Sequence, residues 1–147
     1  MAACVPICGI GAHLTLSNAH VDPSYTCPNP SDRRPYDVHT TIDVDNYTGN
    51  KVTIRSISEA DLNFAVHGSW SGSAGTKGGG DIKDFKPTTI NAGDKTQIKF
   101  GIGFECTNSG PTDDTYGDFS FKFTVVTSGG TFHLDAVDTH RLQIQKS

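Results

Sequence analysis

The sequence predicts an all-β protein, built as one antiparallel β-sandwich of about seven to nine short strands joined by long polar loops. Apolar and polar residues alternate strictly from Phe119 to Val125, which is typical of a strand with one buried face. The same alternation runs from Ile98 to Cys106. The composition is the third observation, since 16 Gly and 7 Pro among the 147 residues make the chain rich in turn formers. No window of the sequence has a convincing helical periodicity.

The first half of the chain contains four shorter alternating runs that predict strands, at residues 13–17, 36–45, 52–56 and 62–67. The last of these has Leu62, Phe64 and Val66 on its apolar face. The segment between the first two runs is dense in turn formers and predicts a long irregular connection. Gly49 suits the turn between the second and third runs, because glycine adopts positive φ without a Cβ clash.

The second half begins with residues 69–80, a Gly- and Ser-rich segment that we expect to form a mobile loop with Trp70 at its root. A polar loop follows the strand that ends at Cys106. A weak edge segment interrupted by Pro87 is predicted at residues 82–90, and a tight turn at residues 91–94 leads into the Ile98 strand. A second turn at residues 128–130 leads to two closing strands, at residues 132–136 and 142–144.

Residues 12–146 resemble the immunoglobulin-like sandwiches of secreted and cell-surface proteins, both in strand number and in the inward-pointing Cys106 of a late strand. The resemblance implies a sandwich domain, which we expect to span residues 12–147 behind an apolar N-terminal arm of residues 1–11. Such sandwiches serve in adhesion, ligand binding and structural roles. The resemblance therefore implies an extracellular or cell-surface protein and leaves its ligand open.

The four cysteines are expected to form two disulfides in an oxidising compartment, because their spacing matches no zinc module. Of the three possible pairings, we favour Cys27 with Cys106, since Cys106 points inward and Cys27 precedes the first long strand. Cys4 and Cys8 then close a tight loop. Four reduced, buried cysteines are the alternative.

The charge pattern argues against nucleic acid as a partner. Twelve Lys and Arg against sixteen Asp and Glu leave a net charge of −4, and the largest basic cluster is the pair Arg33 and Arg34. No apolar run reaches the roughly 18 to 20 residues that span a bilayer, so no membrane span is expected. The chain contains neither a Gly-x-Ser-x-Gly elbow nor a His-Glu-x-x-His motif, and we therefore predict that the protein is not an enzyme.

Calcium is the one cofactor that the sequence suggests. Adjacent carboxylates in a loop bind calcium through oxygen atoms, and Asp113, Asp114 and the nearby Asp118 are the candidate ligands. A separate modification signal is the sequon that begins at Asn46, on a predicted turn where glycosylation is accessible.

These observations favour a non-enzymatic extracellular module for protein recognition, adhesion, or surface or filament assembly. A carbohydrate-binding sandwich, with or without calcium, is the alternative, and its candidate aromatic contacts are Trp70, Tyr116 and Tyr47. An enzyme with an unrecognised site is the third hypothesis.

Residues 1–11 contain no charged side chain and no polar side chain except thiols. A free arm of this composition exposes Val5, Ile7 and Ile10 to water, so we expect it either to pack on its own domain or to dock on another copy. Docking on another copy predicts self-association through residues 1–11. The sequence leaves both outcomes open.

Overall fold

The computed structural model describes residues 13–28, 33–107 and 110–146. This part of the chain consists of strands and connections, and it contains no helix long and apolar enough to cross a membrane. The strands are β1 (Leu14–Val21), β2 (Ser24–Cys27), β3 (Pro35–Asn46), β4 (Val52–His67), β5 (Thr76–Gly78), β6 (Ile82–Lys86), β7 (Thr89–Ile90), β8 (Lys95–Glu105), β9 (Thr115–Thr127), β10 (Gly130–Asp135) and β11 (His140–Ile144). The prediction of an all-β protein is confirmed.

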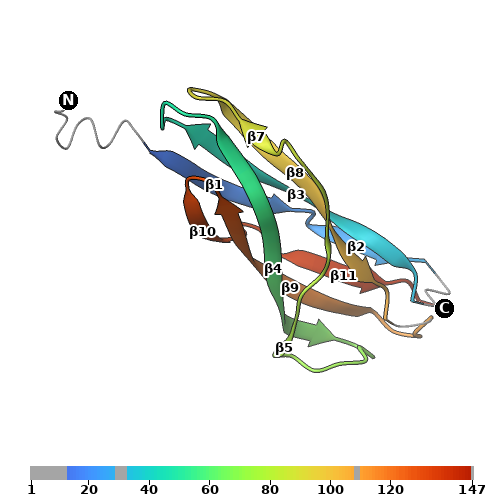
Figure 1. The fold of residues 1–147 in the computed structure, drawn as a ribbon. Helices are drawn as coiled ribbons and strands as arrows, with labels where there is room; N and C mark the ends of the chain where they lie inside the picture. The colour runs from blue at the N-terminus through green and yellow to red at the C-terminus, as the bar shows by residue number, and fades with distance from the viewer. Residues whose placement is uncertain (1–12, 29–32, 108–109, 147) are drawn as a thin grey trace.

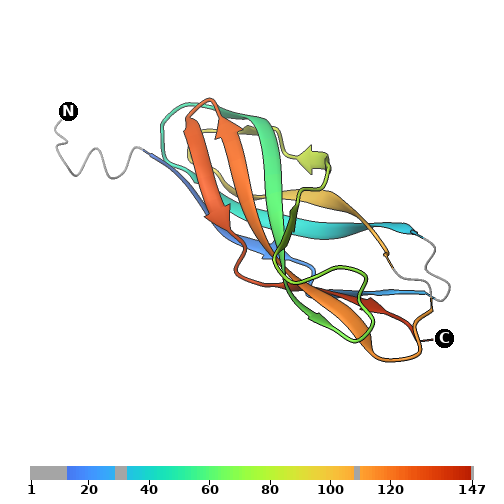
Figure 2. The same cartoon turned by 90° about the horizontal axis from the view of Figure 1, so that it is seen from below.

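The strands form two sheets packed as a sandwich (Figure 1). The first sheet has four strands in the order β1-β3-β8-β6. The second has seven, with the path β2-β11-β9-β4-β5, β10 paired to β9 and β7 paired to β4. Figure 2 shows β4 in green beside β9 and β10 in orange and red, as this pairing requires. The pairs are antiparallel except for β2 with β11.

Alternation along the long strands builds the core between the two sheets. Every second residue of β3 is buried from Tyr36 to Asn46. On the facing strands, the ring of Phe100 in β8 meets the ring of Phe123 in β9 edge-on, with centroids 5.7 Å apart. This aromatic contact joins the two sheets, and the long strands predicted from the alternation are confirmed.

Strand β4 differs most from the sequence prediction. It runs unbroken for 16 residues, where the alternation predicts two strands. Its register against β9 shifts between Ile54 and Ser56, and again after Asn63. Each shift interrupts the period of two and hides the continuity of the strand. The expected apolar face is also wrong, because Phe64 is 43% and Val66 37% exposed, whereas Asn63 is 3% exposed.

Two short strands lie where irregular segments are predicted, which raises the strand number above the expected seven to nine. β2 lies inside the predicted irregular connection and pairs in parallel with β11. β5 lies inside the segment expected to be a mobile loop and pairs with β4, with Lys77 opposite Leu62. All three residues of β5 are exposed, so it has no apolar alternation. Backbone pairing with strands distant in sequence creates both elements, and a local pattern does not detect them.

The disulfide between Cys27 and Cys106 links the ends of the two sheets. Cys27 is the last residue of β2, Cys106 directly follows β8, and both side chains are buried. Their Cα atoms lie 6.0 Å apart. The structure therefore contains the favoured pairing, while Cys4 and Cys8 lie outside the described residues.

His140 of β11 is a buried, neutral imidazole. Its Nδ1 lies 2.7 Å from the carbonyl oxygen of Asp22, which accepts a hydrogen bond, so Nδ1 carries the proton. Nε2 then accepts from the hydroxyl of Tyr36 at 3.0 Å. Burial lowers the pKa of His140 and raises the pKa of Tyr36, so both groups are uncharged in the folded protein at neutral pH.

We predict that His140 makes the fold less stable in mild acid. An unfolded histidine takes up a proton near pH 6.5, whereas folded His140 does so only at lower pH. The free energy of unfolding therefore falls as the pH drops below about 6.5, by at most about 1.4 kcal/mol per pH unit, until the folded imidazole is also protonated. Urea titrations of the wild type and His140→Gln between about pH 7.5 and 5 measure this, and parallel pH dependences would contradict it.

Candidate functional site

Strand β1 is an edge of the four-stranded sheet, and β3 is its only partner among the described strands. The amide of Tyr47 donates to the carbonyl of His13 at 3.0 Å, so His13, Thr15 and Ser17 direct their backbone groups towards β3, up to the register shift that follows Ser17. The backbone groups of Leu14 and Leu16 consequently point away from the sheet. Within the described chain no strand pairs with them, so the first half of β1 is open to an additional strand.

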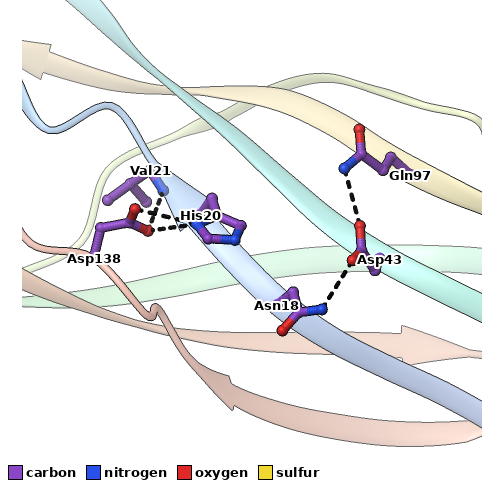
Figure 3. Close-up of polar contacts among 6 residues, drawn as sticks. All are labelled: Asn18, His20, Val21, Asp43, Gln97 and Asp138. Carbon is purple, nitrogen blue, oxygen red and sulfur yellow. Dashed lines mark hydrogen bonds and ion pairs between the residues drawn. The ribbon is translucent and has the colours of Figure 1, made fainter.

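The second half of β1 is covered by the connection between β10 and β11. Asp138 accepts a hydrogen bond from the amide of Val21 at 3.3 Å and lies 3.0 Å from Nδ1 of His20 (Figure 3). The amide of Val137 also donates to the carbonyl of Ala19 at 2.8 Å. These contacts pair the carbonyl of Ala19 and the amide of Val21 and cover the second half of β1, whereas its first half remains open.

Asp43 of β3 connects β1 with β8 (Figure 3). Asn18 Nδ2 donates to one carboxylate oxygen at 3.0 Å, and Gln97 Nε2 donates to the other at 2.9 Å. The hydrogen bonds from Asn18 and Gln97 lower the pKa of Asp43. Asn18 has a φ of 51°, a conformation that asparagine adopts more readily than most residues, at the register shift of β1. These contacts fix the edge strand and leave the outer backbone of its first half free.

A second candidate site is a cavity of about 240 Å³ beside β4 and β5. Trp70 and Phe119 line it, with their rings edge-to-face and centroids 6.1 Å apart. Asp61 and Asn63 of β4 also line it, and both are buried. Gly117 permits this packing, since a Cβ there would lie 2.8 Å from the Trp70 ring. Aromatic walls with a few buried polar groups are typical of a site for a small ligand or a single side chain.

Buried polar groups continue along β4 from this cavity. Glu59 and Asp61 lie two residues apart on β4, and Oε2 of Glu59 is buried with no hydrogen-bond partner. Burial is the largest cause that raises the pKa of Glu59 to about 8, the neighbouring Asp61 raises it further, and burial raises the pKa of Asp61. The amide of Gly80 donates to Oε1 of Glu59, whereas the buried Oδ1 of Asn63 has no hydrogen-bond partner.

Sequence reasoning missed Glu59, Asp61 and Asn63. Their regular spacing was the available signal, because residues two apart on a strand share a face. The predicted break between residues 56 and 62 separated them into a turn and the polar face of a strand. The continuous β4 instead directs all three side chains towards the interior.

The three aromatic candidates for ligand binding do not share a surface. Trp70 is half-buried and lines the cavity. Tyr116 stacks on His67 with ring centroids 4.9 Å apart, and the guanidinium of Arg141 lies 3.7 Å from the Tyr116 centroid. Tyr47 is 42% exposed and follows β3 next to the start of β1, at the end of the sandwich away from β5 (Figure 1). They form no common platform, and Trp70 alone among them borders the cavity.

The candidate calcium ligands have separate partners. The hydroxyl of Thr115 donates to Asp113 at 2.8 Å and is the largest cause of the lowered pKa of Asp113. Asp114 lies 3.6 Å from a lysine ammonium of the C-terminal segment, and Asp118 accepts two hydrogen bonds from Arg141. Across the described ranges, no group of three or more His, Cys, Asp or Glu side chains could hold a metal ion. The predicted calcium loop therefore does not bring its carboxylates together.

Asn46 is not accessible on a turn, contrary to the sequence expectation. It is the last residue of β3 and is 0% exposed. Its Nδ2 donates to the backbone carbonyls of Asn50, Ile90 and Asn91, and its Oδ1 accepts from Thr48. These contacts hold the turn after β3, and the folded domain does not offer the buried amide nitrogen for glycosylation.

No family model and no curated protein matches the sequence. Among solved structures, AggA, the major subunit of aggregative adherence fimbriae type I from Escherichia coli, is similar with 9% identity and a TM-score of 0.41, over 90% of this chain and 95% of that chain. PapD-like domain 7 of human CEP192 has 8% identity and a TM-score of 0.36, over 93% of this chain and 88% of that chain. The secreted serine protease VesC from Vibrio cholerae has 12% identity and a TM-score of 0.36, over 90% of this chain, which spans 23% of that protein. Similarity this low does not assign a function to this protein.

Proposed function

We propose that this protein is a non-enzymatic extracellular or cell-surface module that acts by contact with other proteins, including further copies of itself. The buried disulfide supports this location, since disulfides persist in oxidising compartments and are rare in the cytosol. The observation that carries the proposal is the open first half of β1, which directly follows the uncharged apolar segment at the N-terminus.

The open edge and the N-terminal arm, residues 1–11, have complementary chemistry. The edge offers the outward N–H and C=O groups of Leu14 and Leu16, which an added strand can pair with. The arm offers the β-branched residues Val5 and Ile7 and carries no charge that would oppose docking. Docking the arm of one copy on the β1 edge of another pairs these backbone groups and buries apolar side chains of the arm.

Deletion of residues 1–11 is expected to reduce the mass measured by light scattering from that of an oligomer to that of one chain. Leu16→Pro is expected to have the same effect, because it removes an outward amide and spares the hydrogen bonds to β3. Tyr47→Ser is the matched control, since it removes an exposed aromatic side chain at the same end of the sandwich and no edge amide. A wild type that is monomeric at high concentration, or an unchanged mass after deletion, would end the proposal.

Carbohydrate binding is the second candidate function, favoured by the aromatic wall and buried polar groups of the cavity beside Trp70. A glycan array probed with and without calcium separates it from protein contact. Saturable glycan binding that is lost in Trp70→Ala would support it. The absence of enzymatic activity stays a prediction.

A further inference from the structure

We propose that the cavity beside Trp70 binds an ammonium group on an aliphatic stem, the chemistry of a lysine side chain on a partner protein. This site lies beside β5, at the end of the sandwich away from the start of β1 (Figure 1). It goes beyond arm-mediated contact and does not depend on it. The cavity's charge, hydrogen-bonding capacity and shape all fit such a group.

A buried acidic pair without a basic partner among the described residues lies beside the cavity. Asp61 is 9% exposed, and burial raises the pKa of its carboxyl group and the pKa of Glu59, whose Oε2 is buried with no hydrogen-bond partner. Lys77 lines the same cavity, but neither group takes part in any ion pair with a Lys, Arg or His of the described chain. Buried charges in folded proteins are normally paired. The Asp61 end of the pair lines the cavity, where a cation can reach it.

Asn63 supplies a free hydrogen-bond acceptor in the same cavity. This side chain is 3% exposed, it lines the same cavity, and its Oδ1 has no partner. The cavity therefore presents a buried carboxyl group and an amide oxygen without a hydrogen-bond partner. An ammonium has three N–H donors and no acceptor, so it can satisfy both groups together.

The shape and lining of the cavity also suit an ammonium on an aliphatic stem. Its volume of about 240 Å³ suits one long side chain, and the rings of Trp70 and Phe119 supply an apolar wall for an aliphatic stem. A cation near the face of tryptophan gains further attraction from the ring quadrupole. A calcium ion is less well matched, since it takes roughly six to eight oxygen ligands.

The probe is Nα-acetyl-lysine methylamide, which keeps the side-chain ammonium. The norleucine analogue is its neutral counterpart of similar length. Trp70 is the only tryptophan, so its fluorescence reports on this cavity, and amide chemical shifts of residues 59–63 give an independent readout. We expect saturable binding of the lysine compound in the millimolar range and at least about 10-fold weaker binding of the norleucine compound, as expected for loss of a charge-assisted hydrogen bond.

Asp61→Asn keeps the side-chain size and removes the charge, and it is expected to weaken lysine binding by at least about 10-fold. Asp114→Asn, which alters an exposed carboxylate of the neighbouring loop, is the matched control and should leave binding unchanged. Circular dichroism checks that the variants fold. If Asp61→Asn is unfolded, Trp70→Phe replaces it, with amide chemical shifts as the readout. Trp70→Phe is expected to weaken lysine binding. Equal affinity for norleucine, no saturable response to lysine, or tighter binding of methyl glucoside or calcium chloride would overturn the proposal.

Discussion

Removal of the Cys27–Cys106 disulfide is expected to lower the free energy of unfolding by about 4.5 kcal/mol. The two cysteines lie 79 positions apart, so the bond removes a large loop-closure entropy from the unfolded chain. A domain of this kind has a total stability of roughly 5 to 15 kcal/mol. The double variant Cys27→Ala/Cys106→Ala is therefore expected to unfold at much lower urea concentration than the oxidised wild type.

The control for this experiment is Cys4→Ala/Cys8→Ala, which removes two cysteines from a short separation and leaves the long loop closed. It is expected to cost less than half as much stability, because loop-closure entropy grows with the logarithm of loop length. Urea titrations of the three proteins give the free energies. A loss below about 1 kcal/mol for the Cys27 and Cys106 variant would show that this bond does not anchor the two sheets.

Phe123→Ala is expected to cost about 3 to 5 kcal/mol of stability, the usual range for truncating a buried phenylalanine. Phe123 is 1% exposed and lies between the sheets. Its ring meets Phe100 of the opposite sheet, and it is stacked beside Phe121 at 6.3 Å between centroids. Truncation leaves a cavity at the contact between the sheets, where the strands cannot collapse without shifting their pairing.

Phe64→Ala is the matched control, because Phe64 is a phenylalanine of the same domain with 43% of its surface exposed. Its loss is expected to cost less than about 1 kcal/mol. Urea midpoints and slopes of both variants supply the measurement. Similar losses for Phe64→Ala and Phe123→Ala would contradict the placement of Phe123 at the centre of the core.

Local alternation predicted the strands that lie in the middle of a sheet. β8 and β9 bury every second large side chain over most of their length, so their pattern is visible in about ten consecutive residues. The inward direction of Cys106 followed from the same pattern, and with it the favoured partner Cys27. For these elements, the alternation of adjacent residues predicts which face of the strand is buried.

The candidate sites were less accessible to this reasoning. Asn46 has the sequence of a glycosylation site, and only the carbonyls of residues 90 and 91, brought beside it by pairing, make it a buried structural side chain. Trp70 was singled out as a ligand contact, but its polar companions Asp61 and Asn63 were not. Their importance comes from burial, which their residue types do not predict.

The sequence by itself determined the fold class and the long central strands, because both depend on periodicity within a short stretch of chain, and it favoured the Cys27–Cys106 pairing without deciding it. Only the tertiary structure decided that β4 is continuous, that Asp61 faces the cavity with Phe119, and that half of the β1 edge is open. Bulges change which face of a strand is buried, and whether a strand lies at the edge of a sheet depends on the pairing of all the other strands. Both depend on contacts between residues far apart in the chain, on which local alternation carries no information.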